Sequence, residues 1–288
     1  MTAFTSPRVV IRPALPSDKA DVAEFTKFIW DGHDYVGEVF PHWLNDPQGQ
    51  LFAAEYAGHC VGCAKVTRIA PGQWWLEGFR VDPKFQGLKI GSRLDAACNE
   101  WWDEHGEGTL RLLTNSKRVQ VHHLSEARGF ARVGEVSAYA ADPLSEPTDA
   151  FTPLQPDEAD EAAAFCQRVA SNGFLNLGWK FLLPSADGIR AAARDEYLFF
   201  WWRGRAGFVS AWDDDDERGV RFTVGMEACR GAERVELLGD LRRFASARGA
   251  ALVRWMNNIN AAVLLDLEAA GYRKDWEDSG YLYERNHP

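Results

Sequence analysis

The sequence has few cysteines, a deficit of basic residues and no long apolar run. Its 288 residues include 32 Lys and Arg against 42 Asp and Glu, a formal net charge of −10. Nucleic acids bind to basic surfaces, so this balance argues against a broad nucleic-acid-binding face. A membrane-spanning helix needs about 20 consecutive apolar residues, and we therefore expect no membrane partner.

The N-terminal segment Met1–Arg8 lacks the basic and apolar stretches of a secretory signal. The five cysteines are an odd number, which with this absence favours reduced thiols in the cytoplasm. Cys60 and Cys63 form a CxxC pair within a strand-like segment, where residues three apart face opposite sides. They are then poor joint ligands, and we expect no metal site.

The two halves of the sequence resemble each other. Leu15–Asp21 and Leu154–Asp160 each precede a segment with helical periodicity, and Asn115 and Asn257 each lie 14 residues before a Gly-aromatic pair. Prolines cluster between 142 and 152, where a linker is expected. The sequence therefore predicts a duplication, with domains 1–145 and 146–288.

Each half has the pattern of a mixed α/β fold, with a mostly antiparallel sheet flanked by helices. In the first half we predict strands at 9–12, 51–56, 60–66, 74–81 and 110–114, and helices at 18–30, 91–105 and 120–128. In the second half, 198–202 and 206–212 repeat the first pair of hairpin strands. The acidic run Asp213–Glu217 that follows is interpreted as a solvated hairpin loop.

A glycine-containing loop after the strand 74–81 is the most informative segment. It runs from Gln86 to Gly91 and leads directly into an apolar helix. Free N–H groups at a helix N-terminus carry partial positive charge, and glycines let the backbone approach an anion closely. The loop is therefore a candidate pyrophosphate site; the alternative is an ordinary tight strand-to-helix turn.

The stretch V-D-P-x-x-Q-G-x-x-x-G resembles the motif Q/R-x-x-G-x-G/A of the GNAT (Gcn5-related N-acetyltransferase) superfamily, and the resemblance extends over roughly Arg8–Tyr139. It implies acetyl-CoA as a co-substrate, with no metal. The residues expected at its pyrophosphate are Gln86, Gly87, Leu88, Lys89, Ile90, Gly91 and Ser92. Lys89 departs from the motif, because it stands where the family has its middle glycine.

The resemblance also implies a slot for the pantetheine arm beside the central strand, which in this family splays from its neighbour, often at a bulge. Phe79, Arg80 and Val81 would supply that strand edge, and a backbone N–H there would hold the thioester carbonyl. Asn115 is expected to contact the pantetheine arm or to order the loop after it.

Glu77 is the candidate general base, because many family members place a catalytic Glu four residues before the position of Val81. The alternative is a solvated strand residue, or an ion pair with Arg80 or Arg111. The family's acidic Tyr is replaced by Ser125. His123 is the candidate substitute; alternatively it lies on an ordinary helix face, or no acid is needed, since a thiolate leaves well.

The acceptor site in this family is usually built after the first helix. The candidate residues here are Trp30, Asp31, His33, Asp34 and Tyr35, whose acidic and aromatic side chains suit a small amine or an amino acid; the alternative is a capped, aromatic loop. The resemblance implies N-acetyl transfer by direct attack on the thioester. A non-catalytic acyl-CoA-binding module and a peptide or protein N-acetyltransferase are the other hypotheses.

The second half has lost the features of the candidate loop. At the positions of Lys89 and Gly91 it carries Glu233 and Val235, which would repel and obstruct a pyrophosphate. We therefore predict that this half does not bind CoA. Exposed strand edges near the end of each half also suggest a possible homodimer.

Overall fold

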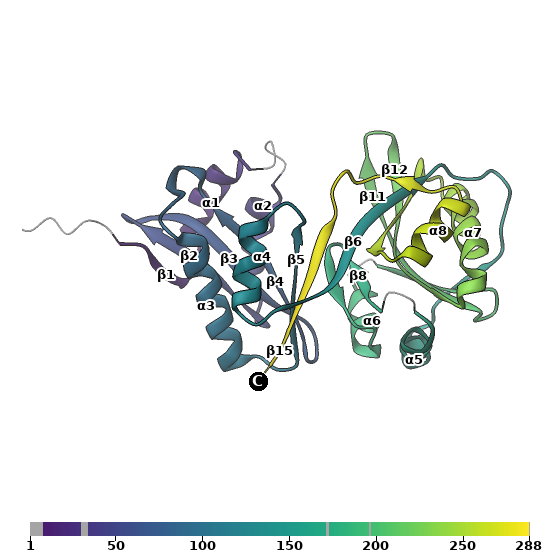
Figure 1. Ribbon diagram of the computed structural model, residues 1–288, viewed down its shortest axis with the longest axis horizontal. Helices are drawn as coiled ribbons and strands as arrows, with labels where there is room; N and C mark the ends of the chain where they lie inside the picture. Colours follow the sequence, from purple (N-terminus) through teal and green to yellow (C-terminus); the bar gives the residue numbers. More distant parts are fainter. Residues whose placement is uncertain (1–7, 30–33, 171–172, 196, 288) are drawn as a thin grey trace, which may run out of the picture. The chain divides into compact units, whose positions relative to one another are not determined.

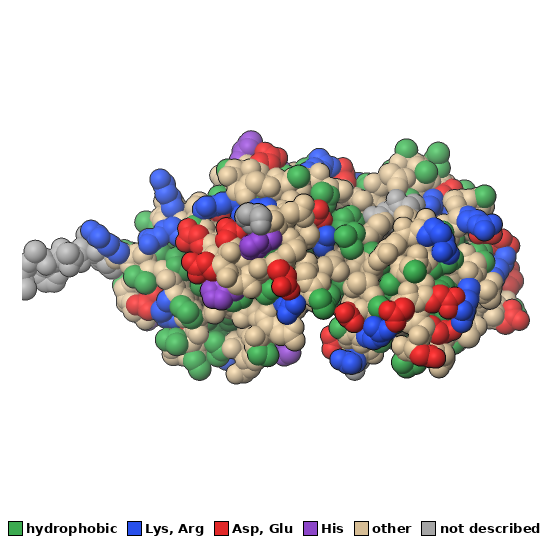
Figure 2. All heavy atoms as spheres, turned by 90° about the horizontal axis from the view of Figure 1, so that it is seen from below, with side chains coloured by type: hydrophobic (Ala, Val, Ile, Leu, Met, Phe, Trp, Pro, Cys, Tyr) green, Lys and Arg blue, Asp and Glu red, His purple; other side chains and the backbone are tan. Residues whose placement is uncertain are grey.

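The computed structural model describes residues 8–29, 34–170, 173–195 and 197–287, and divides into two compact units. The first contains residues 1–110 and 285–288, and the second contains residues 111–284 (Figure 1). Among the described residues, no helix is long and apolar enough to cross a membrane. Figure 2 shows acidic and basic side chains interspersed on one face of the molecule.

The first unit is built on an antiparallel sheet with helices on both faces. In α3, the apolar residues Ile90, Leu94, Cys98 and Trp102 recur every four positions and are all buried, as expected for one helix face. The elements are β1 (Val10–Pro13), α1 (Asp18–Thr26), α2 (Val36–Leu44), β2 (Gly49–Tyr56), β3 (His59–Ala70), β4 (Gln73–Val81), the short η2 (Pro83–Phe85) and α3 (Ile90–His105). The first helix ends at Thr26, four residues before its predicted end, and the other predicted elements of this unit are confirmed to within a few residues.

The CxxC prediction was wrong about which sides the cysteines face. A register shift in the β2–β3 pair, between Ala54 and Glu55, places Cys60 opposite Glu55 and Cys63 opposite Ala53. Residues 53 and 55 share a face, so the two cysteines do as well, and both are buried in the cluster beneath α1 and α2. The extra residue of a β-bulge reverses the alternation that the sequence suggested.

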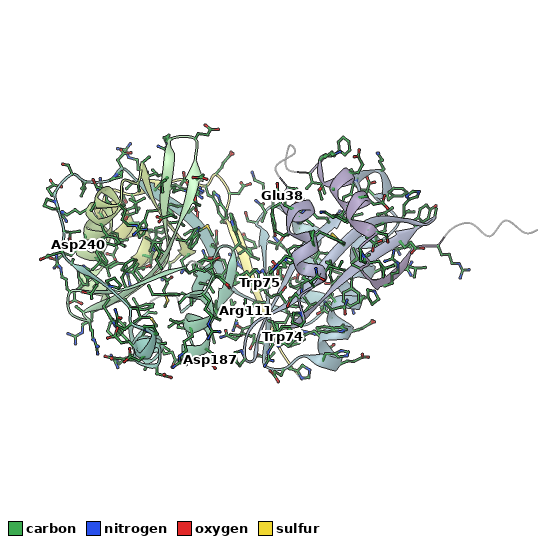
Figure 3. The ribbon with its side chains drawn as sticks, turned by 180° about the vertical axis from the view of Figure 1, so that it is seen from behind. Glu38, Trp74, Trp75, Arg111, Asp187 and Asp240 are labelled. Carbon is green, nitrogen blue, oxygen red and sulfur yellow. The ribbon has the colours of Figure 1, made fainter. Side chains whose placement is uncertain are left out.

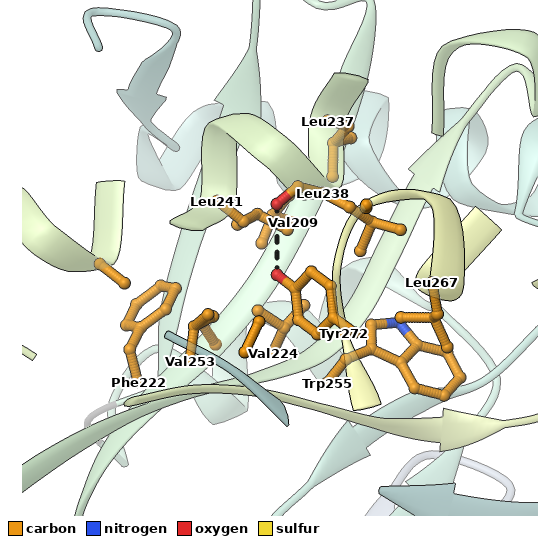
Figure 4. Close-up of a cluster of buried hydrophobic side chains, with 14 of the residues drawn as sticks. Val209, Phe222, Val224, Leu237, Leu238, Leu241, Val253, Trp255, Leu267 and Tyr272 are labelled. Atoms are coloured by element: carbon orange, nitrogen blue, oxygen red, sulfur yellow. Dashed lines mark hydrogen bonds between the residues drawn. The ribbon is translucent and has the colours of Figure 1, made fainter. Parts of the chain in front are cut away.

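The second unit contains a larger sheet with the strand order β5-β15-β6-β13-β12-β11-β10-β7. Its core, drawn in Figure 4, includes Tyr272, whose buried hydroxyl donates to the Leu238 carbonyl at 3.2 Å. The elements that complete the chain are β5 (Thr109–Asn115), α4 (Val119–Ala127), β6 (Ala131–Ala141), β7 (Phe151–Pro153), η3 (Pro156–Glu158), α5 (Ala159–Val169), β8 (Leu175–Leu177), β9 (Lys180–Leu182), α6 (Ala186–Ala192), β10 (Leu198–Trp202), β11 (Gly207–Asp216), β12 (Gly219–Cys229), η4 (Gly231–Glu233), α7 (Arg234–Ala247), β13 (Leu252–Asn258), α8 (Ala261–Ala269), β14 (Arg273–Lys274) and β15 (Gly280–Asn286).

The two sequence repeats exchange their last strands. The first part of β6 pairs with β15, from Ala131–Glu284 to Val136–Gly280, and its second part pairs with β13. The final strand of the second repeat thus joins the strand that ends the first, and both edges that suggested a homodimer are paired within one chain. The homodimer stays a prediction, as does the boundary between residues 145 and 146; the compact units divide instead at residue 110, inside β5.

The acidic run is mostly strand and not loop. Asp213–Asp216 forms the end of β11, paired with the start of β12, and only residues 217 and 218 form the turn. Asp213 pairs with Arg248 at 2.5 Å and Asp214 pairs with Arg221 at 2.5 Å. Arg221 on the neighbouring strand β12 and Arg248 at the end of α7 stabilise this acidic strand, which a local composition argument does not foresee.

Candidate active site

The candidate pyrophosphate loop leads into α3 without a side-chain cap. Lys89 is the N-cap residue and adopts the left-handed conformation, with φ of +56°. No side chain accepts a hydrogen bond at this helix start, and the first turn contains no acidic residue. The amide groups of Ile90, Gly91 and Ser92 therefore open the helix with a partial positive charge and no competing carboxylate.

The two loop glycines leave space for an anion. Gly87 has a φ of +88°, and a Cβ added at Gly87 or at Gly91 would meet no atom within 4 Å. Behind the loop, Gly62 of β3 permits close packing, because a Cβ there would lie 3.2 Å from Ile90 and 3.3 Å from Leu94. The residues present thus fit a pyrophosphate: the space in front of the two glycines is open, and the start of α3 packs against the sheet.

A β-bulge in β4 brings Glu77 and Arg80 to one face of the sheet. Glu77 lies opposite Lys65 and Arg80 lies opposite Cys63, so β4 has one extra residue between them. The bulge contains Gly78, with a φ of +67°, and a Cβ at Gly78 would overlap the ring of Trp43 on α2. Residues three apart would otherwise face opposite sides, so the bulge creates this pairing.

A side chain of the neighbouring strand β3 holds the Glu77 carboxylate. Thr67 Oγ1 donates a hydrogen bond to Glu77 Oε1 at 2.6 Å. Figure 3 labels Trp75, the neighbouring buried residue on the same face of β4. The pKa of Tyr35 is raised to about 12 by loss of hydration and by the negative charge of Glu77. Tyr35 therefore keeps its proton at neutral pH and is available as a donor.

Asp34 and Arg80 form an ion pair on this face. The Asp34 side chain is fully buried; one oxygen accepts from Arg80 Nε and the other accepts from the Val36 N–H at 2.9 Å, at the start of α2. The Arg80 guanidinium lies over the Tyr35 ring at 5.7 Å and donates to the Phe79 carbonyl. The Asp34 carboxylate thus connects Arg80 of β4 to the start of α2. Trp30, Asp31 and His33 lie outside the described residues.

On the edge of β4 that faces away from β3, a backbone donor lies at the predicted place. The Asp82 N–H donates to the Val61 carbonyl of β3 at 2.9 Å. Because successive N–H groups of a strand point to opposite edges, the Val81 N–H is directed away from β3. This donor direction is what the predicted hydrogen bond to a thioester carbonyl requires.

The remaining site candidates belong to the second unit. Asn115 ends β5, where its Oδ1 accepts from the Lys117 N–H at 2.8 Å and its carbonyl contacts His122 Nε2 at 3.1 Å. His122 and Ser125 are buried, whereas the His123 side chain is 76% exposed and lies 4.0 Å from Glu126. This is the environment of a solvated helix residue, and the catalytic role of His123 stays a prediction.

The two arginines named as alternative partners of Glu77 have carboxylate partners elsewhere. Arg80 pairs with Asp34, and Arg111, labelled in Figure 3, pairs with Glu284 of β15 at 2.8 Å. Sequence reasoning missed the neighbours of Glu77 on β3: Thr67, which donates a hydrogen bond to it, and Lys65, which lies opposite it. The only signal for them was their place in the strand 60–66 and just after it, and the bulge that sets their register is not visible in the sequence.

In the second repeat, side chains fill the places that correspond to the candidate pyrophosphate loop and to the slot beside the central strand. Helix α7 begins after Glu233 and carries Glu236 in its first turn. Its first residue, Arg234, is buried and contacts Asp266 at 2.5 Å and Glu227 at 3.4 Å. Where the β12–β13 ladder ends, Trp255 donates to Glu227 at 2.5 Å.

A further side-chain bridge joins the same two strands. Asn257 of β13, which corresponds to Asn115, donates to the Gly225 carbonyl of β12 and to the Phe174 carbonyl. Together with the Trp255–Glu227 bond, this bridge crosses the place between β12 and β13 where the family opens its slot. The second repeat thus has acids at its helix start and a filled gap beside its central strand.

The fold and the helix-start loop define an acetyltransferase of tandem architecture, and comparisons with known proteins agree. Residues 20–130 match the model of the acetyltransferase (GNAT) family. An aminoglycoside N(6')-acetyltransferase type 1 of Stenotrophomonas maltophilia is 33% identical over 136 residues, 44% of this chain and 88% of that protein. The N-alpha-acetyltransferase RimI of Mycobacterium tuberculosis is 30% identical over 138 residues, 46% of this chain and 85% of that protein.

Solved structures match both halves together, and a tandem protein is among them. A tandem GNAT protein from the clavulanic acid biosynthesis pathway superposes with a TM-score of 0.62 at 13% identity, covering 98% of this chain and 99% of its own. That likeness concerns the fold. The chain belongs to the GNAT family of acetyltransferases and consists of two tandem GNAT-like domains.

Proposed function

We propose that the protein is an N-acetyltransferase that moves the acetyl group of acetyl-CoA to a primary amine of a small molecule or amino acid. The observation that carries this proposal is the uncapped, acid-free start of α3 behind two open glycine positions, in the same unit as the Glu77 carboxylate. Acetyl-CoA supplies an activated thioester. The loop 86–91 and Ser92 would hold its pyrophosphate, and Asn115 would contact the pantetheine arm or order the loop that follows.

Glu77 is proposed as the general base. Alkyl amines are largely protonated at neutral pH, so the acceptor must lose a proton before or during attack. The Glu77 carboxylate takes that proton, directly or through one water, as the amine nitrogen bonds to the thioester carbon, and the Val81 N–H stabilises the negative charge that develops on the carbonyl oxygen. The C–S bond then breaks, and CoA leaves as the thiolate. Tyr35 keeps its proton at neutral pH and its ring lies against the Arg80 guanidinium, so its hydroxyl is a candidate donor for orienting the acceptor.

The charges around Glu77 favour a cationic amine. Asp34 pairs with Arg80 and Asp46 pairs with Lys65, so each of these two ion pairs is neutral, and Glu77 adds a negative charge. An aminoglycoside, as in the name of one relative, is a cationic small molecule of this class. The other relative is an N-alpha-acetyltransferase, and a peptide or protein N-terminus is therefore the second candidate acceptor.

The second repeat is proposed to be silent toward CoA. Arg234, Glu227 and Trp255 form a buried cluster at the start of α7, in which Arg234 forms an ion pair with Glu227 and Trp255 donates a hydrogen bond to it. Glu233 and Glu236 place negative charge where a pyrophosphate would sit. We propose that this domain, residues 146–288, serves the first one structurally.

A binding and turnover experiment tests the proposal. Acetyl-CoA binding is measured by calorimetry and thermal shift, since a ligand of the native state raises its melting temperature. We expect one site per chain, lost in Gly91→Val and retained in Glu77→Gln. With cationic amines, small or peptidic, Glu77→Gln should lower kcat by roughly 10²–10⁴-fold.

Three results would contradict parts of this proposal. Unchanged turnover in Glu77→Gln would remove Glu77 as the base. Binding without turnover on any amine would favour a non-catalytic acyl-CoA-binding module. An absence of binding at millimolar acetyl-CoA would mean that the fold has been retained without its chemistry.

A further inference from the structure

We propose that Thr67 is a positioning residue for Glu77, whose hydroxyl fixes and stabilises the carboxylate that acts as the base. This inference rests on the proposed function of Glu77. It starts from a short side-chain contact of this carboxylate, the 2.6 Å hydrogen bond from Thr67 Oγ1 to Glu77 Oε1.

The register of β3 and β4 makes this contact a built feature of the sheet. Lys65 lies directly opposite Glu77, and Thr67 lies opposite Trp75, so all four side chains share one face. Thr67 is then the diagonal neighbour of Glu77 across the ladder, a position within reach of a side-chain hydrogen bond. Thr is stiff at χ1, so its hydroxyl is directed with little loss of conformational freedom.

A buried ion pair anchors the same stretch of β3. Lys65 is fully buried; its Nζ contacts Asp46 at 2.6 Å and donates to the Val66 carbonyl at 3.1 Å. Burial opposes the ionisation of Asp46, but the hydrogen bond from Lys65 lowers the pKa of that carboxyl below its usual value. Gly49 leaves the space for the ammonium group, because a Cβ there would overlap Lys65 Nζ. The strand that carries Thr67 is thereby fixed next to Glu77.

The charged and titratable groups near Glu77 come from three elements. Lys65 lies on β3, Arg80 on β4, and Tyr35 at the start of α2; Asp34 and Asp46 neutralise the two cations. Within this setting the Thr67 hydroxyl donates to Glu77 Oε1 and so fixes the direction of the carboxylate. An ionised carboxylate accepts several hydrogen bonds, so the bond from Thr67 is compatible with proton abstraction from the acceptor.

Two variants of Thr67 separate the hydroxyl from the shape of the side chain. Thr67→Val keeps the β-branched shape and removes the donor, and Thr67→Ser keeps the donor. With saturating acetyl-CoA and an amine that the protein acetylates, we expect Thr67→Val to lower kcat roughly tenfold with little change in the KM for the amine. Thr67→Ser should restore kcat.

A double-mutant cycle with Glu77→Gln completes the test. If Thr67 acts through Glu77, Thr67→Val should have almost no further effect on kcat in the Glu77→Gln background. Equal losses in both backgrounds, or a normal kcat in Thr67→Val, would overturn the positioning role while leaving Glu77 as the base. Normal turnover of Glu77→Gln itself would instead remove Glu77 as the base, so the two failures are distinguishable.

Discussion

Lys89 occupies the one position where this loop departs from its family's motif, and the structure shows what that departure involves. The residue has a φ of +56°, a conformation that glycine adopts freely and that costs an L-residue roughly 1–2 kcal/mol. Lys89 thus keeps the backbone shape that the motif's glycine provides. Its side chain adds a positive charge at a helix start that binds anions in the proposed function.

We expect Lys89→Gly to stabilise the protein by about 1 kcal/mol, because it removes the left-handed strain. Urea denaturation followed by tryptophan fluorescence measures the change in the free energy of unfolding. Lys89→Ala is the matched control, since it removes the same charge but keeps a Cβ, and it should give no such gain. Equal stabilities of the two variants would show that the conformation carries no penalty here.

At the scale of the element, the bulge in β4 is the feature on which the site depends. It sets Glu77 and Arg80 on one face and lets the Trp43 ring pack over Gly78. The strand and Glu77 as its candidate base were predicted from the sequence, but the alternation rule alone would have placed Arg80 on the opposite side. Bulge formation depends on the register of the β3 partner, which local sequence does not specify.

Gly78→Ala should destabilise the protein by roughly 3 kcal/mol and reduce acetyl transfer, because the new Cβ is strained and also overlaps Trp43. Gly72→Ala is the control. Gly72 has the same φ of +67°, yet a Cβ there would meet no atom within 4 Å. Its variant should therefore show the backbone strain alone, roughly 1 kcal/mol. Comparable losses in the two variants would argue against a packing role for Gly78.

At the scale of the whole molecule, the exchange of terminal strands makes the two repeats interdependent. β15, the last strand of the second repeat, pairs with the first part of β6, and Leu282 and Tyr283 within it are buried. The second part of β6 pairs with β13. Each repeat on its own would leave an unpaired strand edge with apolar side chains, which favours aggregation.

Fragments 1–145 and 146–288 should therefore be poorly soluble when produced alone and form a 1:1 complex when produced together. Size-exclusion chromatography with light scattering measures the mass, and acetyl-CoA binding reports whether the loop is native. Cooperative thermal unfolding of a soluble, monomeric fragment 1–145 would contradict the interdependence of the repeats.

The sequence by itself determined the mixed α/β fold, the duplication and the place of the candidate cofactor loop. These follow from local signals: hydrophobic periodicity, a glycine-containing loop before an apolar helix, and matching residues in the two halves. Tertiary structure alone decided the cysteine faces, the pairing of the acidic strand, the bulge at Gly78, the contact of Thr67 with Glu77, and the exchange of β6 and β15. Each of these depends on which strand becomes a partner and in which register, and that choice is made by contacts between residues distant in the sequence.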